Sequence, residues 1–242
     1  MRKIIAFMGC TLALVACDKH DPILPGTRTA VFDSTDVKVT NKTITTIPTT
    51  EFTHDNTNCP YTQDNTNVIR NGDKKIFTGF PTKNTVTAQR QPICDGKYIY
   101  AGLTTGEVVK INPNNRNIAW IADIFRASNM TGGTPTVDIV TPIVPMKNSV
   151  FAGGLGDAFC KLNATSGVKQ WCANIGVGVP FTVTEKHTFV VTTDNNLYAI
   201  DNQDGTAVWK TKIKTQTKPV LDGQYLIVGR ERIDIATGKL ID

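Results

Sequence analysis

The side chains best suited to chemistry in this chain of 242 residues are six cysteines and three histidines. Thiols and imidazoles can bind a metal ion or form a nucleophile and base pair, but both uses need several such groups close together. No Cys-x-x-Cys pair occurs, and the histidines lie far apart in the sequence, at His20, His54 and His187. The sequence therefore gives no metal signature, and we expect no cofactor.

Two cysteines lie on either side of a short turn, residues 163–167. On adjacent strands of a hairpin, Cys160 and Cys172 could face each other and form a disulfide in an oxidising compartment. They could equally be two small buried residues that never react. The sequence leaves both alternatives open.

Cys17 has a different setting, at the end of an apolar N-terminal segment. Arg2 and Lys3 are followed by an apolar run, 4–15, that is too short for a permanent membrane span, and then by Leu-Val-Ala-Cys. This spacing predicts a signal peptide over residues 1–16, of the type found in bacterial lipoproteins, with Cys17 as the lipid attachment site. An ordinary secretory signal with an incidental cysteine is the alternative.

Acylation would bind the mature protein to a membrane. Each buried methylene contributes about 0.8 kcal/mol, so two or more chains such as palmitate hold a protein there durably. Asp18 follows the cysteine. In enteric bacteria such an acidic residue tends to mark retention at the inner membrane. The inner membrane is therefore an alternative location to the outer membrane.

Composition separates a polar segment from a folded body. Residues 17–64 are rich in Thr, Asn and Asp and have no sustained apolar face, which predicts a lipidated flexible tether. Residues 65–242 have short apolar runs and turn residues. The net charge is +5, but no basic run interleaved with aromatic residues occurs, which argues against nucleic-acid binding.

The folded body consists of a repeat. The copy from Pro180 to Trp209 contains four short strand patterns joined by turns rich in Asn, Asp and Gly. Similar copies open at Pro92, Pro142 and Pro219. One four-stranded sheet cannot bury both of its faces, so the copies must stack. We therefore predict an all-β fold, a β-propeller of four-stranded antiparallel blades, with about four to five blades.

The turn before each closing strand predicts how the blades are built. A leading Asn or Asp can accept hydrogen bonds from the backbone two residues on, and a final glycine can adopt positive φ. The first copy has Arg116 where the others have glycine. The glycines are Gly167, Gly205 and Gly238. The tryptophans that follow the turns supply apolar area that locks one blade on the next, and they are Trp120, Trp171 and Trp209. We expect Trp171 and Trp209 to be mostly buried.

The last copy leaves open how the two ends of the array of blades are joined. The only spare strand-forming segment lies at residues 68–80, either as an incomplete blade or as a strand that completes the last one. We expect it to pair beside residues 239–242 and fasten the two ends together. The competing prediction is a homodimer in which two open half-rings cover each other's edges.

The turn and tryptophan pattern, as in Asn163-Ala164-Thr165-Ser166-Gly167 followed by Trp171, resembles the pyrroloquinoline-quinone-type propeller repeat. Together with the Leu-Val-Ala-Cys motif and the stretch 24–28, it resembles more narrowly the BamB family, lipoprotein subunits of the outer-membrane β-barrel assembly machinery. The resemblance covers roughly residues 10–30 and 85–242. The family's ring usually has eight blades, so this chain looks shortened. Asp138, before a Thr-Pro, matches part of the family's acidic loop and is carried over as a candidate partner contact.

The resemblance implies a non-enzymatic lipoprotein scaffold at the periplasmic face of the outer membrane. Its partners would be the membrane-embedded assembly subunit (BamA-like) and unfolded outer-membrane proteins. One alternative is a fragment of a quinoprotein dehydrogenase, which shares the repeat, although the chain is short and has no adjacent cysteine pair. Another is a generic periplasmic protein-binding propeller.

Overall fold

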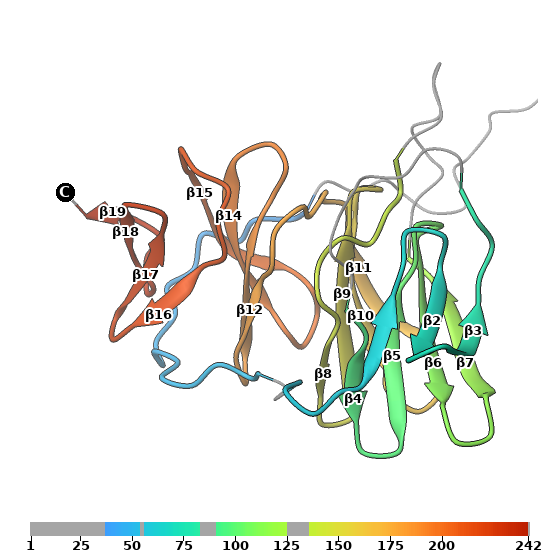
Figure 1. Cartoon of the computed structure of the whole chain (residues 1–242). Helices are drawn as coiled ribbons and strands as arrows, with labels where there is room; N and C mark the ends of the chain where they lie inside the picture. The colour runs from blue at the N-terminus through green and yellow to red at the C-terminus, as the bar shows by residue number, and fades with distance from the viewer. Residues whose placement is uncertain (1–36, 54–55, 83–90, 125–135, 242) are drawn as a thin grey trace, which may run out of the picture. The chain divides into compact units, whose positions relative to one another are not determined.

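The computed structural model describes residues 37–53, 56–82, 91–124 and 136–241. Within these ranges the chain forms nineteen strands and no helix (Figure 1). The strands are β1 (Tyr61–Gln63), β2 (Val68–Asn71), β3 (Lys74–Thr78), β4 (Ile93–Asp95), β5 (Tyr98–Gly102), β6 (Glu107–Asn112), β7 (Asn117–Asp123), β8 (Val144–Met146), β9 (Ser149–Gly154), β10 (Ala158–Asn163), β11 (Lys169–Ala173), β12 (Thr182–Val183), β13 (His187–Val191), β14 (Asn196–Asp201), β15 (Ala207–Lys212), β16 (Val220–Asp222), β17 (Tyr225–Val228), β18 (Glu231–Asp234) and β19 (Leu240–Ile241).

The described strands form one three-stranded and four four-stranded antiparallel sheets, each with its strands in sequence order. We call them blade 1 (β1–β3), blade 2 (β4–β7), blade 3 (β8–β11), blade 4 (β12–β15) and blade 5 (β16–β19). The predicted fold class is confirmed: the described residues form an all-β, partial propeller with four four-stranded blades and one three-stranded blade.

Apolar side chains on both faces of the blades meet those of the neighbouring blade. The four hydrophobic clusters each combine residues from two consecutive blades: blades 1 and 2, 2 and 3, 3 and 4, and 4 and 5. Strands at the centre of a blade are accordingly buried throughout, as in β9 and most of β14. Burial on both faces explains why these strands show continuous apolar runs instead of strict alternation.

The turn before the closing strand folds as its sequence predicts. In blade 3, Asn163 Oδ1 accepts hydrogen bonds from the backbone N–H groups of Thr165 at 2.9 Å and Ser166 at 3.0 Å. Gly167 then adopts φ of 73° and donates its N–H to the Asn163 carbonyl. The equivalent glycines of blades 4 and 5 have φ of 76° and 72°.

Each tryptophan of a closing strand docks on the turn of the following blade. Its indole ring lies on the turn glycine, where an added Cβ would come within 2.6–2.7 Å of a ring carbon. Its Nε1 also donates a hydrogen bond to a carbonyl of the same turn. The three pairs are Trp120 with Gly167 and the Ala164 carbonyl (3.1 Å), Trp171 with Gly205 and the Asn202 carbonyl (3.1 Å), and Trp209 with Gly238 and the Ile235 carbonyl (2.9 Å). Trp120 and Trp209 are buried, whereas Trp171 is partly exposed.

Blade 1 lacks this docking residue. Phe77 pairs with Ile69 just before a register shift, the position that Trp120 holds opposite Lys110 in blade 2. Blade 1 therefore has no indole ring to pack on the turn of blade 2, and that turn does not require a glycine. Arg116 occupies that turn position with φ of 58° and an exposed side chain, which explains the departure of the first copy from the repeat.

The predicted tether, 17–64, is wrong for most of its described residues. Residues 38–42 run parallel to the start of β15, with Thr40 N–H donating to the Ala207 carbonyl at 2.8 Å. Ile44 is 3% exposed in the cluster between blades 4 and 5, and Glu51 pairs with Lys218 at 2.6 Å. We call residues 37–53 the strap. The sequence did not predict the strap because its composition is polar and few of its side chains are buried.

The predicted pairing of residues 68–80 with residues 239–242 is also wrong. Strands β2 and β3 form a hairpin with each other, and β1 completes their sheet. In the described residues β19 pairs with β18. The segment is thus an incomplete blade, the other option that the sequence left open, and it begins at Tyr61, before the predicted boundary at 65.

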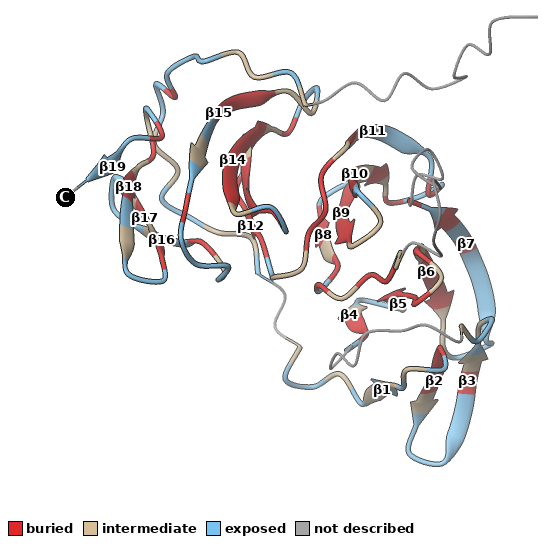
Figure 2. Cartoon of the chain, turned by 90° about the horizontal axis from the view of Figure 1, so that it is seen from above, coloured by how far each residue is buried: buried red, intermediate tan, exposed pale blue. Residues whose placement is uncertain are grey.

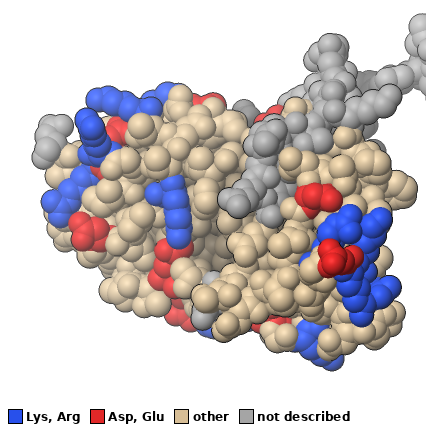
Figure 3. All heavy atoms as spheres, in the orientation of Figure 1, with Lys and Arg blue, Asp and Glu red and all other residues tan. Residues whose placement is uncertain are grey.

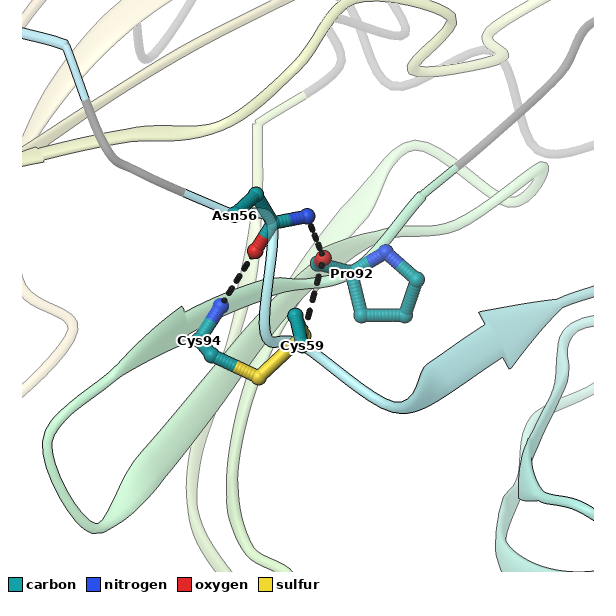
Figure 4. The surroundings of a disulfide bond; sticks show 4 residues. All are labelled: Asn56, Cys59, Pro92 and Cys94. Carbon is teal, nitrogen blue, oxygen red and sulfur yellow. Dashed lines mark hydrogen bonds between the residues drawn. A yellow bond between two sulfur atoms is a disulfide. The ribbon is translucent and has the colours of Figure 1, made fainter.

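The described residues contain two disulfides. Cys160 and Cys172 are directly opposite each other on β10 and β11 and are bonded. Cys59 and Cys94, which the sequence did not pair, join the segment before β1 to strand β4. Beside that bond, Asn56 donates its side-chain N–H to the Pro92 carbonyl at 2.9 Å and accepts the N–H of Cys94 at 3.1 Å (Figure 4). The side chain of Asn56 therefore extends the pairing of β4.

Two glycine substitutions separate the docking contact from backbone strain. Gly205 and Gly223 both have positive φ, but a Cβ at Gly223 would meet nothing within 4 Å. We expect Gly223→Ala to cost about 1–2 kcal/mol of unfolding free energy from backbone strain. Gly205→Ala should cost a further 1–3 kcal/mol, roughly, because its methyl group would collide with Trp171. Urea unfolding of both variants measures the difference, and equal losses would contradict the docking role.

A second pair of variants tests the strap. Ile44→Ala removes a buried side chain, so we expect it to lower the unfolding free energy by about 2–4 kcal/mol. Thr46→Ala, at an exposed strap position, serves as the control and should change it by less than about 0.5 kcal/mol. Similar, negligible effects of both substitutions would mean that residues 37–53 act as a free tether.

Candidate interaction surface

Metal ligands and titratable side chains are the first groups to examine in a search for a catalytic site. Within the described ranges, no three His, Cys, Asp or Glu side chains lie close enough to hold a metal ion. His187, on β13, is partly buried, and burial lowers its pKa, so the neutral imidazole is favoured. The search for metal ligands does not cover residues 125–135 or the other undescribed segments. No helix in the described part of the chain has the length and apolar character needed to cross a bilayer.

The polar side chains that are buried between blades serve the fold. Lys110 Nζ donates to the Ala164 carbonyl at 2.7 Å and lies 4.3 Å from the centre of the Tyr98 ring. Burial lowers the pKa of this lysine. Lys161 makes the equivalent bond to the Asn202 carbonyl at 2.8 Å. Each lysine therefore shares its acceptor carbonyl with the docked tryptophan of the same blade, which is a structural role.

The site residues expected from the sequence have different outcomes. Cys17 and Asp18 lie outside the described residues. Asp138, the candidate partner contact, is 0% exposed, and its backbone carbonyl accepts the N–H of Leu155 at 2.9 Å. That prediction is wrong because a side chain without solvent-accessible surface cannot contact a partner. Trp120, Trp171, Trp209 and the three turn glycines have the predicted structural role described above.

One cavity lies where the strap meets the inner strands. Its volume is about 130 Å³, and most of its lining is apolar, including Phe52, Ile143 and Phe181. The ion pair of Glu51 and Lys218 lies at the same site. Because Glu51 and Lys218 neutralise each other, this pair offers no unpaired charge to a ligand in the cavity. The rest of the lining is mainly apolar.

Charged side chains do not form a broad surface of one sign on the face shown in Figure 3. Acidic residues lie beside the lysines and arginines in each of the charged groups on that face. Large tan areas separate these groups. This face therefore has no continuous basic surface of the kind that binds nucleic acid.

The outer edge strands of the blades are the remaining candidates for binding. An edge strand exposes unpaired backbone groups, and proteins usually protect it with charges, covering segments or short length. Four of the five outer strands have such protection. Strand β3 has Lys74 and Lys75, β11 begins with Lys169 and contains a disulfide, β15 has Lys210 and Lys212 and is partly covered by the strap, and β19 has two described residues.

Strand β7 differs from them, because its one charged residue is Asp123 at its end. It is seven residues long, contains no lysine, arginine or proline, and is largely exposed along its length (Figure 2). Ile118 and Ile121 are each 48% exposed, a large fraction for apolar side chains on a strand. In the described residues its only strand partner is β6. The outer edge of β7 is therefore our candidate interaction surface, one that the sequence did not single out.

A family model described as outer membrane protein assembly factor BamB matches residues 78–211 and 144–241, which is more than half of the chain. The chain is also similar to the crystal structure of BamB from Moraxella catarrhalis. The TM-score is 0.53 at 12% sequence identity, over 74% of this chain and 59% of that one. At this identity the similarity supports the propeller fold alone, and this chain spans less than two thirds of the Moraxella protein.

Other solved structures are similar at lower scores. The quinohemoprotein alcohol dehydrogenase from Comamonas testosteroni has a TM-score of 0.42 at 17% identity, covering 50% of this chain and 20% of the enzyme. The computationally designed protein Ika8 has a TM-score of 0.48 at 10% identity, covering 74% of this chain and 52% of the design. No curated protein sequence matches the chain significantly. On the strength of the family model, this chain belongs to the BamB family of outer-membrane protein assembly factors.

Proposed function

We propose that the chain is a non-enzymatic scaffold protein in the assembly of outer-membrane β-barrels. The match of the BamB family model to residues 78–241 carries this proposal. The partners would be the membrane-embedded assembly subunit (BamA-like) and unfolded outer-membrane proteins. The blades suit such a role because they hold a rigid set of strand edges and turns against which partners can bind.

The proposal places the protein at the periplasmic face of the outer membrane, anchored through lipid on Cys17. A lipid anchor keeps a scaffold near its membrane-embedded partner without a membrane-spanning segment. Disulfides agree with an oxidising compartment outside the cytoplasm, and the described residues contain two.

Co-purification from detergent-solubilised membranes tests the scaffold role. The full-length chain with a C-terminal tag should recover the assembly subunit, identified by mass spectrometry. The Trp209→Ala variant, whose docking contact is lost, serves as a control for dependence on the folded propeller. Recovery of a bound quinone, or absence of the assembly subunit from the wild-type eluate, would contradict the proposal.

Fractionation tests the anchor separately. Cys17→Ser removes the thiol that would be acylated, so the protein should move from the membrane pellet to the soluble periplasmic fraction. Separation of the two membranes on a sucrose gradient then shows whether the wild-type protein is in the outer or the inner one. If Cys17→Ser stays in the pellet in high salt, the protein has another anchor and the lipid proposal fails.

A further inference from the structure

We propose that the outer edge of β7 binds extended polypeptide segments by strand addition, and that it selects segments with an apolar residue at every second position. This inference rests on the proposed function and names the contact surface for unfolded clients. Its first support is the backbone of β7. An extended segment can form main-chain hydrogen bonds with this seven-residue edge strand on either side of the register shift next to Trp120.

The side chains of blade 2 supply the second support. Ile99 pairs with Ile111, which pairs with Ile118, so an apolar row runs across three strands to the outer edge. A parallel row runs through Ala101 and Val109 to Ile121. The inner members of both rows are at most 1% exposed. An added strand with apolar residues opposite Ile118 and Ile121 would continue both rows and bury their exposed ends.

The chain itself shows that a blade edge accepts an extended segment. Strap residues 38–42 lie against β15 in parallel orientation, bonded to it by three backbone hydrogen bonds of 2.8–3.1 Å that involve Ala207 and Val208. Val39 of the strap packs on the cluster between blades 3 and 4. The added segment thus combines main-chain bonds with an apolar contact. On β15 the chain's own strap occupies the edge, whereas no described strand does so on β7.

The occupant that fits this edge is an unfolded strand of a transmembrane β-barrel. Such strands alternate apolar residues for the lipid with polar residues for the lumen. Before insertion they are extended and have unpaired backbone groups. Their apolar residues would meet Ile118 and Ile121, while the period of two places the intervening polar residues on the other face. A second copy of this chain pairing β7 with β7 is the competing occupant, and the experiment distinguishes it.

The test uses the full-length soluble Cys17→Ser protein and two fluorescent peptides. One peptide alternates valine and threonine with lysine at both ends, and the other has proline in place of its central valine. Fluorescence anisotropy should show binding of the first peptide and at least about tenfold weaker binding of the second, because proline removes a ladder donor. Equal binding of both peptides would overturn strand addition.

Variants then locate the site. Ile121→Lys places a charge on the edge and should weaken binding of the valine and threonine peptide by about tenfold or more. Val168→Lys is the matched control, since Val168 is an apolar residue with 63% exposure in the turn between β10 and β11, and it should bind as the parent protein does. Equal affinity of Ile121→Lys and Val168→Lys would overturn the assignment to β7.

Two further measurements make the result independent of folding defects. Hydrogen exchange of the parent protein should slow in residues 117–123 when the peptide is added, and unchanged exchange there would overturn the proposal. Sedimentation shows the oligomeric state: a dimer that Ile121→Lys dissociates and the peptide does not would assign the edge to a second copy. If co-purification with the assembly subunit succeeds while these tests fail, the scaffold role stands and only this surface is rejected.

Discussion

The contact between an indole ring and a bare glycine on the next blade is the interaction on which the arrangement of this propeller depends. It satisfies two requirements at once: the ring covers apolar surface, and its N–H satisfies a turn carbonyl at 2.9–3.1 Å. A methyl group at the glycine would overlap the ring, and positive φ disfavours other residues in any case. The turn of one blade is thus constrained by the closing strand of the blade before it.

The register within each blade serves the same contact. In blades 2, 3 and 4 the ladder between the last two strands shifts next to the pair that contains the tryptophan. An extra residue in the closing strand bends it and turns the side chains that follow. The lysines of β6 and β10 that face Trp120 and Trp171 donate to the same carbonyls as the indoles. Intrablade register and interblade packing are therefore parts of one arrangement.

Where the indole is missing, other links are found. Blade 1 has Phe77 at the docking position, which can cover apolar surface but has no N–H to donate. Between blades 1 and 2 the chain has the Cys59–Cys94 disulfide, and Asn67 bonds to both the side chain and the backbone of Thr104. Such links hold a blade that has three described strands, one fewer than blade 2 has.

The sequence predicted what is local and periodic. Strand spacing, the Asn or Asp that opens a turn, and the glycine that closes it all lie within one copy, so one sequence is enough to predict them. The position of the strap was not predictable in this way, because Ile44 is one buried apolar residue in a polar segment and its partners are about 150–190 residues away. The Cys59–Cys94 bond likewise joins residues with a sequence separation of 35 and no shared motif. Asp138 failed for a related reason, since motif similarity carries no information on burial.

The strap also changes the reach of the proposed lipid anchor. A tether from Cys17 to residue 64 could extend roughly 160 Å, at about 3.4 Å per residue. Because Lys38 and Thr40 are already bonded to Ala207 of blade 4, only about 20 residues separate Cys17 from the propeller, and their greatest span is roughly 70 Å. A lipid on Cys17 would thus hold the protein through the outer edge of blade 4, not through β1. Pairing with a fixed edge would limit both the distance and the point of attachment of the proposed anchor, so an edge strand of the propeller would set how far the folded body can lie from the lipid.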